Sequence, residues 1–175
     1  MVMKNVTYDY SSVHIDVPKE IADDIINWGR KEISDREIFV MPRDPGLGRE
    51  DEIHATVLYG IHADKPDQVE KLVSGQEPLK VRLGKIEVFT NPEKYDVVVI
   101  HVISHDLRRL NKMLREKVSY TNKYSSYRPH VTIAYVKKGK GWKHRGVDRW
   151  EGTEFTCDHL VFSSTNGTKH KIAFK

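Results

Sequence analysis

The chain has 175 residues, 31% of them charged, and a formal net charge of +4 at pH 7. This length is enough for one compact domain with its own hydrophobic core, and the apolar runs, which are only strand-length, exclude a membrane-spanning helix. The single cysteine excludes an internal disulfide, and because no secretory signal opens the chain, we expect a cytoplasmic protein.

The first half of the chain predicts a strand, a helix, a loop and a second strand. Residues 12–17 have a strand pattern, and residues 18–28 begin with Pro18 and carry apolar side chains at helical spacing. Residues 41–50 contain two prolines and two glycines, which predicts a loop. The second strand then starts at His54.

The second half repeats this order. A β-branched run at 95–103 predicts a strand, residues 106–118 predict a helix, and a further strand starts at His130. Aligning His14 with His101 superposes the two halves, which is typical of a duplicated unit. The last strands are expected around residues 155–162 and 171–174.

One six-residue pattern, H-x-T-[VI]-x-Y, occurs twice, at residues 54–59 and 130–135. Two H-x-T triplets alone would prove little in a chain with 9 histidines, but a tyrosine three residues after both threonines makes the repeat specific. Strand alternation predicts that histidine and threonine of each copy share one face, while Tyr59 and Tyr135 point to the opposite face. The candidate catalytic residues are His54, Thr56, His130 and Thr132.

These residue types suit acid–base chemistry at a phosphodiester. An imidazole with an ordinary pKa of about 6.5 can be neutral or protonated near pH 7, so one histidine can act as general base and the other as general acid. Threonine hydroxyls can donate hydrogen bonds to phosphate oxygens as negative charge develops. The near symmetry of the motifs leaves open which histidine starts as the base.

Several other features allow two interpretations. Basic residues and tryptophans alternate in residues 137–150, which form either a solvated loop with core-capping tryptophans or a cationic rim that stacks bases. His14 and His101 either line the cleft or are ordinary sheet residues. A metal site is not expected, because the chain has one cysteine and lacks an H-E-x-x-H motif.

The two motifs resemble those of the 2H phosphoesterase superfamily, which is defined by two h-H-x-[ST]-h elements. Here the elements are residues 53–57 and 129–133, and the second departs from the pattern only in Pro129. The resemblance covers essentially the whole chain and implies an α+β, bilobal, duplicated fold with a central cleft. It places lobe one at about 11–75 and lobe two at about 78–175.

Within that superfamily, the H-A-T-V-L-Y-G form of the first motif is most similar to the phage anti-CBASS nucleases. This resemblance implies hydrolysis of the 3′–5′ linkages of cyclic di- and trinucleotide immune signals, by attack of a substrate 2′-hydroxyl and without a metal or other cofactor. Such a bacteriophage enzyme would serve immune evasion in the host cytoplasm. Candidate substrate-binding residues are Tyr10, Arg128, Trp142, Trp150 and Glu151.

Two alternatives use the same sequence differently. An RNA-end 2′,3′-cyclic phosphodiesterase or 2′–5′ RNA ligase-like protein would use the same four residues but would need a longer basic groove. The chain has 25 acidic residues against 29 basic ones, which argues mildly against such a groove. A non-catalytic nucleotide-binding module would not need both histidines, so the intact motifs disfavour it. No membrane contact and no obligate protein partner are expected.

Overall fold

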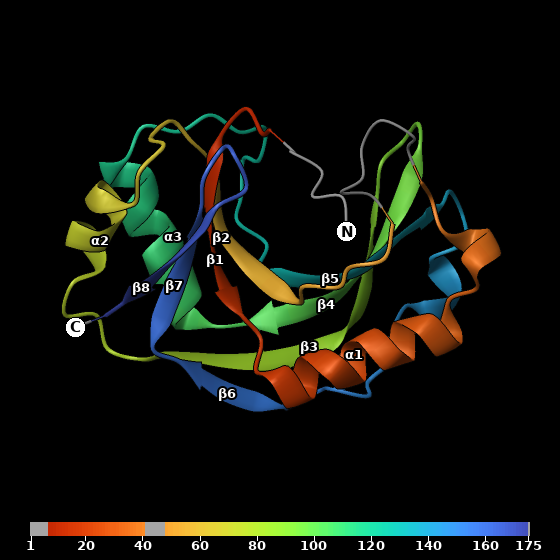
Figure 1. Cartoon of the computed structure of the whole chain (residues 1–175). Coiled ribbons are helices and arrows are strands. Elements are labelled where there is room, and N and C mark those ends of the chain that lie inside the picture. The colour runs from red at the N-terminus through yellow and green to blue at the C-terminus, as the bar shows by residue number, and fades with distance from the viewer. Residues whose placement is uncertain (1–6, 41–47, 175) are drawn as a thin grey trace.

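The computed structural model describes residues 7–40 and 48–174 of the chain (Figure 1). Most of the loop predicted at 41–50 lies outside these residues. The elements, in chain order, are β1 (Ser11–Asp16), α1 (Lys19–Glu32), η1 (Asp35–Glu37), β2 (His54–Ile61), α2 (Asp67–Val73), β3 (Leu79–Thr90), β4 (Tyr95–Ile103), α3 (His105–Lys117), β5 (His130–Lys137), η2 (Trp142–His144), β6 (Glu154–Cys157), β7 (His159–Ser163) and β8 (Lys169–Ala173).

The strands form one curled antiparallel sheet in the order β6-β3-β4-β5-β2-β1-β7-β8, and the predicted α+β class is confirmed. The lobes differ from the predicted boundaries in one respect. β7 and β8 come last in the sequence, yet β7 pairs with β1. The C-terminal strands therefore lie with the first half of the chain and not with the expected second lobe, because β1 offers a free edge that they cover.

The helix-covered face of the sheet carries the core. Alternate side chains of the central strands are buried there against α1 and α3, and the polar motif residues are left on the other face. In Figure 1, α2 and α3 lie together at one end of the molecule, and α1 runs along the sheet at its lower edge. Core residues from both halves include Val13, Ile15, Ile25, Ile100, Leu107, Leu114 and Val131.

Each helix packs beneath the motif strand of the other half, where β1–α1–β2 is the first half and β4–α3–β5 the second. In α1, Gly29 lies so close to β5 that an added Cβ would be 2.9 Å from Cγ2 of Ile133. In α3, the buried Asn111 amide donates a hydrogen bond of 2.7 Å to the carbonyl of Val57 in β2. Both motif strands are thus supported by the half to which they do not belong.

Each motif strand contains a β-bulge directly after its threonine. The registers of β2 with β1 and of β5 with β4 shift there, which leaves Val57 and Ile133 without partners across the ladder. A bulge interrupts the strand alternation. Tyr59 and Tyr135 therefore lie on the same face as the motif histidines and threonines, and their predicted placement on the opposite face is wrong.

The register also corrects the predicted alignment of the repeat. The residue opposite His54 is Asp16, and the residue opposite His130 is His101. Asp16 and His101 are therefore the equivalent positions, and the predicted match of His14 with His101 is two residues out of register. The two halves consequently surround their histidines with different chemistry.

The motif strands β2 and β5 pair with each other at Ala55 and Val131 and then diverge. Beyond that point, the edge of each strand is covered by the segment that leads into the other motif. The loop between α3 and β5 lies along β2, where the Thr121 amide donates to the carbonyl of Gly60 at 2.8 Å. The segment before β2 lies along β5, where the Tyr135 amide donates to the carbonyl of Gly48 at 2.8 Å. The free edges of both strands are covered in the same way.

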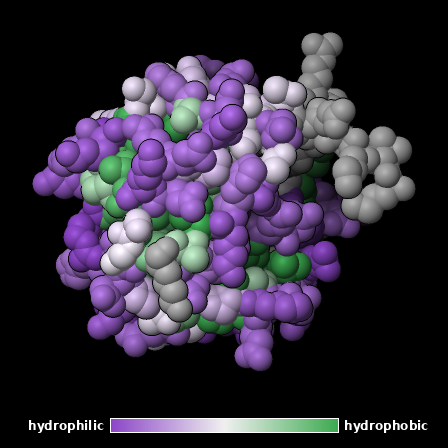
Figure 2. Space-filling view, turned by 60° about the vertical axis from the view of Figure 1, so that its left-hand side comes forward, coloured by the Kyte–Doolittle hydropathy of each residue, from purple (hydrophilic) through white to green (hydrophobic). Residues whose placement is uncertain are grey.

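The surface is mainly hydrophilic on the face that includes α2 and the C-terminal strands, with smaller hydrophobic areas between the polar side chains (Figure 2). Of the helices in the described ranges, none is long and apolar enough to cross a membrane.

Candidate active site

The centre of the sheet brings the two motifs together. β2 and β5 pair antiparallel at Ala55 and Val131, whose side chains are buried on the helix side. On the other face, continuing this register sets each motif histidine beside the threonine of the other motif. The four residues that the sequence predicts as catalytic, His54, Thr56, His130 and Thr132, are therefore gathered on one face.

Both histidines are held by the same hydrogen bond. Nδ1 of His54 lies 2.6 Å from the carbonyl oxygen of Glu52, and Nδ1 of His130 lies 2.7 Å from the carbonyl oxygen of Arg128. A carbonyl only accepts, so Nδ1 must carry the proton in each ring. This tautomer leaves Nε2 of both histidines with a lone pair when neutral, and available for proton transfer.

A second histidine packs against His54. The ring of His14 lies 4.7 Å from that of His54, centroid to centroid, and its Nε2 is 3.4 Å from Oδ1 of Asp16. Burial and, to a smaller extent, the charge of His54 lower the pKa of His14 to about 4, while Asp16 opposes the shift. His14 is therefore neutral near pH 7 and forms an uncharged wall beside His54.

Two charged residues near His54 are not predicted by the sequence. Burial raises the pKa of Glu50, while the charges of His54 and Lys169 act in the opposite direction. Lys169 on β8 also forms an ion pair with Glu52. No motif marks these residues, because β8 reaches the site only through its pairing with β7. Among the described residues, no three histidine, cysteine, aspartate or glutamate side chains are grouped to hold a metal ion.

The surroundings of His130 are more apolar and more basic. Its ring packs edge-on against Phe89 at 4.8 Å, and the guanidinium of Arg128 lies 4.2 Å from the centroid of Phe89. Burial lowers the pKa of His130, and the charges of His54, Arg128 and His101 lower it further, against the hydrogen bond to the Arg128 carbonyl. His130 thus favours the neutral form. Arg128, predicted to bind substrate, does lie beside a motif histidine.

The loop between α3 and β5 is fixed to the first motif by side chains. The Tyr127 hydroxyl donates to the carbonyl of Thr56 at 2.9 Å, and the Asn122 amide donates to the carbonyl of Tyr59 at 3.0 Å. Sequence reasoning missed both residues, which lie in an irregular segment. Their bonds connect the strand of His54 to the loop that ends at His130.

Tyr10 lies at the β1 end of the motif face. Its ring is 5.4 Å from that of His62 and 6.3 Å from that of Tyr59, in an edge-on arrangement with the latter. Tyr10 therefore packs against the tyrosine of the first motif, whereas Tyr8 is 46% exposed.

Trp150 and Glu151, which the sequence predicts to bind substrate, do not lie on the motif face. Trp150 is 4% exposed, packs edge-on against Trp28 and donates from Nε1 to Asp24 of α1, so it caps the core and cannot stack on a base. Glu151 is exposed and lies 4.0 Å from Lys85 in an ion pair. The core-capping interpretation is therefore correct for Trp150.

Trp142 is 48% exposed and lies on η2. The preceding residue, Gly141, sits against Val88 and Val136, whose side chains belong to the helix side of the sheet. The backbone next to Trp142 thus packs on the helix side of the sheet, and the Trp142 ring lies 6.0 Å from the guanidinium of Arg145.

A curled antiparallel sheet with two H-x-T strands at its centre defines a phosphoesterase of the 2H type. The model of the 2′–5′ RNA ligase superfamily matches residues 41–169, and the chain belongs to this family.

The relatives support the same class. The chain is 28% identical over 174 residues to an RNA 2′,3′-cyclic phosphodiesterase of Methanocaldococcus jannaschii, covering 90% of this chain and 94% of the relative. These comparisons support a phosphoesterase, and they do not single out the cyclic-oligonucleotide subtype.

Solved structures share the fold at low sequence identity. The apo form of Escherichia coli LigT superposes with a TM-score of 0.63 at 19% identity, covering 97% of this chain and 96% of that one. The protein TT0787 of Thermus thermophilus gives 0.63 at 16% identity, covering 93% and 97%. Usb1 of Kluyveromyces marxianus gives 0.59 at 8% identity, covering 95% and 98%. LigT has also been solved with 3′-AMP.

Proposed function

We propose that the protein is a metal-independent two-histidine phosphodiesterase that hydrolyses 2′,3′-cyclic phosphate ends of RNA. The observation that carries this proposal is the matched pair of imidazoles, each held through Nδ1 by a backbone carbonyl, on two motif strands that pair at Ala55 and Val131. The family and the archaeal relative support the choice of RNA ends as the substrate.

The arrangement assigns the first proton transfer to His130. Since burial lowers its pKa, His130 is neutral near pH 7, and its Nε2 takes a proton from water as the oxygen attacks phosphorus. The bond between phosphorus and one ribose oxygen breaks, and His54 protonates that oxygen. Thr56 and Thr132 donate hydrogen bonds to the non-bridging oxygens. The product is a terminal phosphomonoester.

The same groups can run the related cleavage of an internal 3′–5′ linkage. One histidine deprotonates a 2′-hydroxyl, which attacks the adjacent phosphorus, and the other protonates the departing 5′-oxygen, giving a 2′,3′-cyclic phosphate. This is the reaction expected for cyclic di- or trinucleotides. The form of the first motif, His54–Gly60, is the observation that favours this second candidate.

A substrate panel in EDTA separates the two candidates. Purified protein is incubated with 2′,3′-cyclic-phosphate RNA, 2′–5′-linked RNA and 3′–5′ cyclic dinucleotides, and products are identified by mass spectrometry. We expect the cyclic-phosphate end to be opened. Cyclic dinucleotides, if cleaved, must lose reactivity in their 2′-deoxy form, because the nucleophile in this mechanism is the 2′-hydroxyl of the substrate. Strict dependence on added Mg²⁺ or Mn²⁺ would contradict the proposal.

We expect a bell-shaped dependence of kcat/KM on pH, because the base must be neutral and the acid protonated. The base form of His130 is present above its pKa, which burial lowers, so the rising limb should have its midpoint below the ordinary histidine value of about 6.5. Initial rates from pH 4 to 9 at fixed ionic strength measure it. A rising limb centred well above 6.5 would show that His130 is not the base.

A further inference from the structure

We infer that a single strand of RNA extending beyond the reacting phosphate binds along a surface formed by Arg128, Tyr124, Arg108 and Lys112, here called the α3 ridge. The inference rests on the proposed function only for the identity of the strand as RNA. It differs from the expectation drawn from the sequence, in which the acidic residues of the chain argue against a longer basic groove for nucleic acid.

The α3 ridge begins at the active site. Phe89 contacts the ring of His130 and carries the guanidinium of Arg128 on its face. The carbonyl of Tyr127, the residue before Arg128, accepts a hydrogen bond of 3.1 Å from Nη1 of Arg108 on α3. A continuous series of contacts therefore leads from a motif histidine to the exposed side of the helix.

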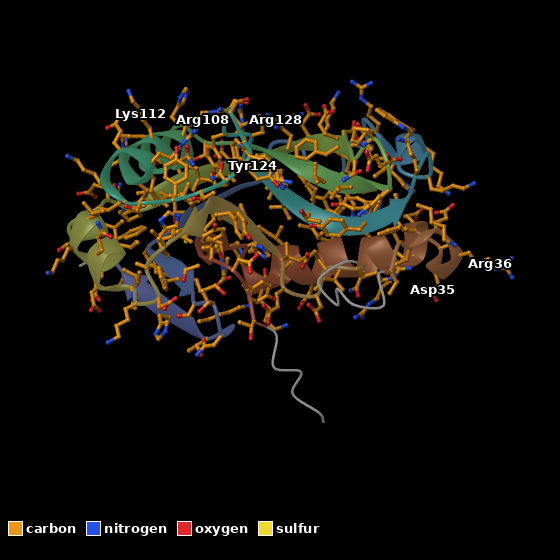
Figure 3. The ribbon with its side chains drawn as sticks, turned by 90° about the horizontal axis from the view of Figure 1, so that it is seen from above. Asp35, Arg36, Arg108, Lys112, Tyr124 and Arg128 are labelled. Atoms are coloured by element: carbon orange, nitrogen blue, oxygen red, sulfur yellow. The ribbon has the colours of Figure 1, made fainter. Side chains whose placement is uncertain are left out.

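Along α3 the positive charge continues. Lys112 lies four residues after Arg108, so the two side chains share a face of the helix, about 6 Å apart along its axis. Figure 3 shows Arg108, Lys112 and Arg128 projecting from the same side of the molecule, with Tyr124 in the same region of that view. A row of cations of this kind tracks a phosphate backbone.

These cations are not neutralised by the protein. Within the described ranges, none of Arg108, Lys112 and Arg128 forms an ion pair with a carboxylate. Arg109, the next residue on the same helix, instead pairs with Asp106 at 3.1 Å. The ridge therefore keeps its charge for an external anion.

An exposed aromatic ring completes the surface. Tyr124 is 69% exposed, although its backbone is held in place because its amide donates to Oδ1 of Asn122 at 3.1 Å. Asn122 is in turn bonded to the carbonyl of Tyr59 on the motif face. Bases stack on such rings with little sequence preference, at about 1–3 kcal/mol per base. The combination of ring and cations fits single-stranded RNA.

The test compares two double variants with equal charge loss. Arg108→Gln/Lys112→Gln removes two cations of the ridge, and Arg36→Gln/Lys31→Gln removes an exposed pair elsewhere, with Arg36 at the far end of the molecule (Figure 3). Binding of a fluorescent oligoribonucleotide of about ten nucleotides with a 3′-phosphate is followed by anisotropy between about 50 and 200 mM salt. This readout needs no turnover, so it is independent of the proposed reaction.

We expect the ridge variant to lose about 1.4 from the slope of log Kd against log salt, at about 0.7 per phosphate contact. Between about 50 and 200 mM salt, the increase in the Kd of the ridge variant should therefore be about sevenfold smaller than that of the wild type. Lys112→Glu alone should weaken binding at low salt, and the Arg36→Gln/Lys31→Gln protein should bind as the wild type does. Equal losses in both double variants, or none in the ridge variants, would overturn the inference. Intact binding without turnover would instead overturn only the proposed function.

Discussion

His54→Ala and His130→Ala are each expected to lower kcat by about 10²–10⁴-fold, because each removes a positioned proton donor or acceptor. Binding of a substrate analogue should be largely retained, since the threonines and the rest of the motif face remain. Single-turnover rates and equilibrium binding of a 3′-phosphate nucleotide measure the two effects separately. The large loss should appear in both variants, because the histidines act on opposite sides of the same phosphorus.

A histidine outside the site provides the control. His105 is exposed at the start of α3, and His105→Ala should keep near-wild-type turnover. Near-wild-type rates for either His54→Ala or His130→Ala would contradict the two-histidine mechanism, whichever substrate proves to be correct.

The second large effect concerns stability. Gly60 has φ of 92°, and an added Cβ would lie 1.9 Å from the carbonyl oxygen of Thr121, which is backbone and cannot turn away. Gly60→Ala should therefore destabilise the fold by about 3 kcal/mol or more, as the sum of overpacking and left-handed strain. Urea unfolding followed by circular dichroism measures the free energy of unfolding.

Gly75→Ala separates the two contributions. Gly75 has a similar φ of 78°, but nothing lies within 4 Å of a Cβ built there. It should lose only about 1 kcal/mol, the cost of the backbone conformation alone. Equal losses at the two positions would show that the α3–β5 loop is not packed against β2 as the structure has it.

The sequence predicts the strands that carry a regular pattern, and it fails where the pattern is broken. It does not predict β3, because the ladder of β3 with β4 shifts between Leu83 and Ile86 and the intervening residues interrupt the alternation. It does not predict the short α2 either. The predicted faces of Tyr59 and Tyr135 are wrong for the same reason, since a period of two has no signature for a bulge.

The candidate site follows the same division. The two histidines and threonines could be predicted, because a motif that occurs twice in one chain needs no tertiary information. Asn122 and Lys169 could not, because each reaches the first motif through contacts between distant segments. Trp150 is predicted to bind substrate but is buried. An aromatic residue among basic ones has the same appearance in the sequence whether it caps a core or binds a base.

The covering of each motif strand by the segment that leads into the other motif has a consequence for the history of the fold. In a single strand–helix–strand unit, the edge of the motif strand would be exposed and the carbonyl at its bulge would have no hydrogen-bond donor. In this chain, the segment that covers the edge and the group that donates to the carbonyl both come from the other half. Such a unit is complete only when paired with a copy of itself, as in an isologous dimer. The present chain corresponds to that dimer joined into one polypeptide. Because the two halves are parts of one polypeptide, they need not be identical, and one histidine lies opposite Asp16 while the other lies opposite His101.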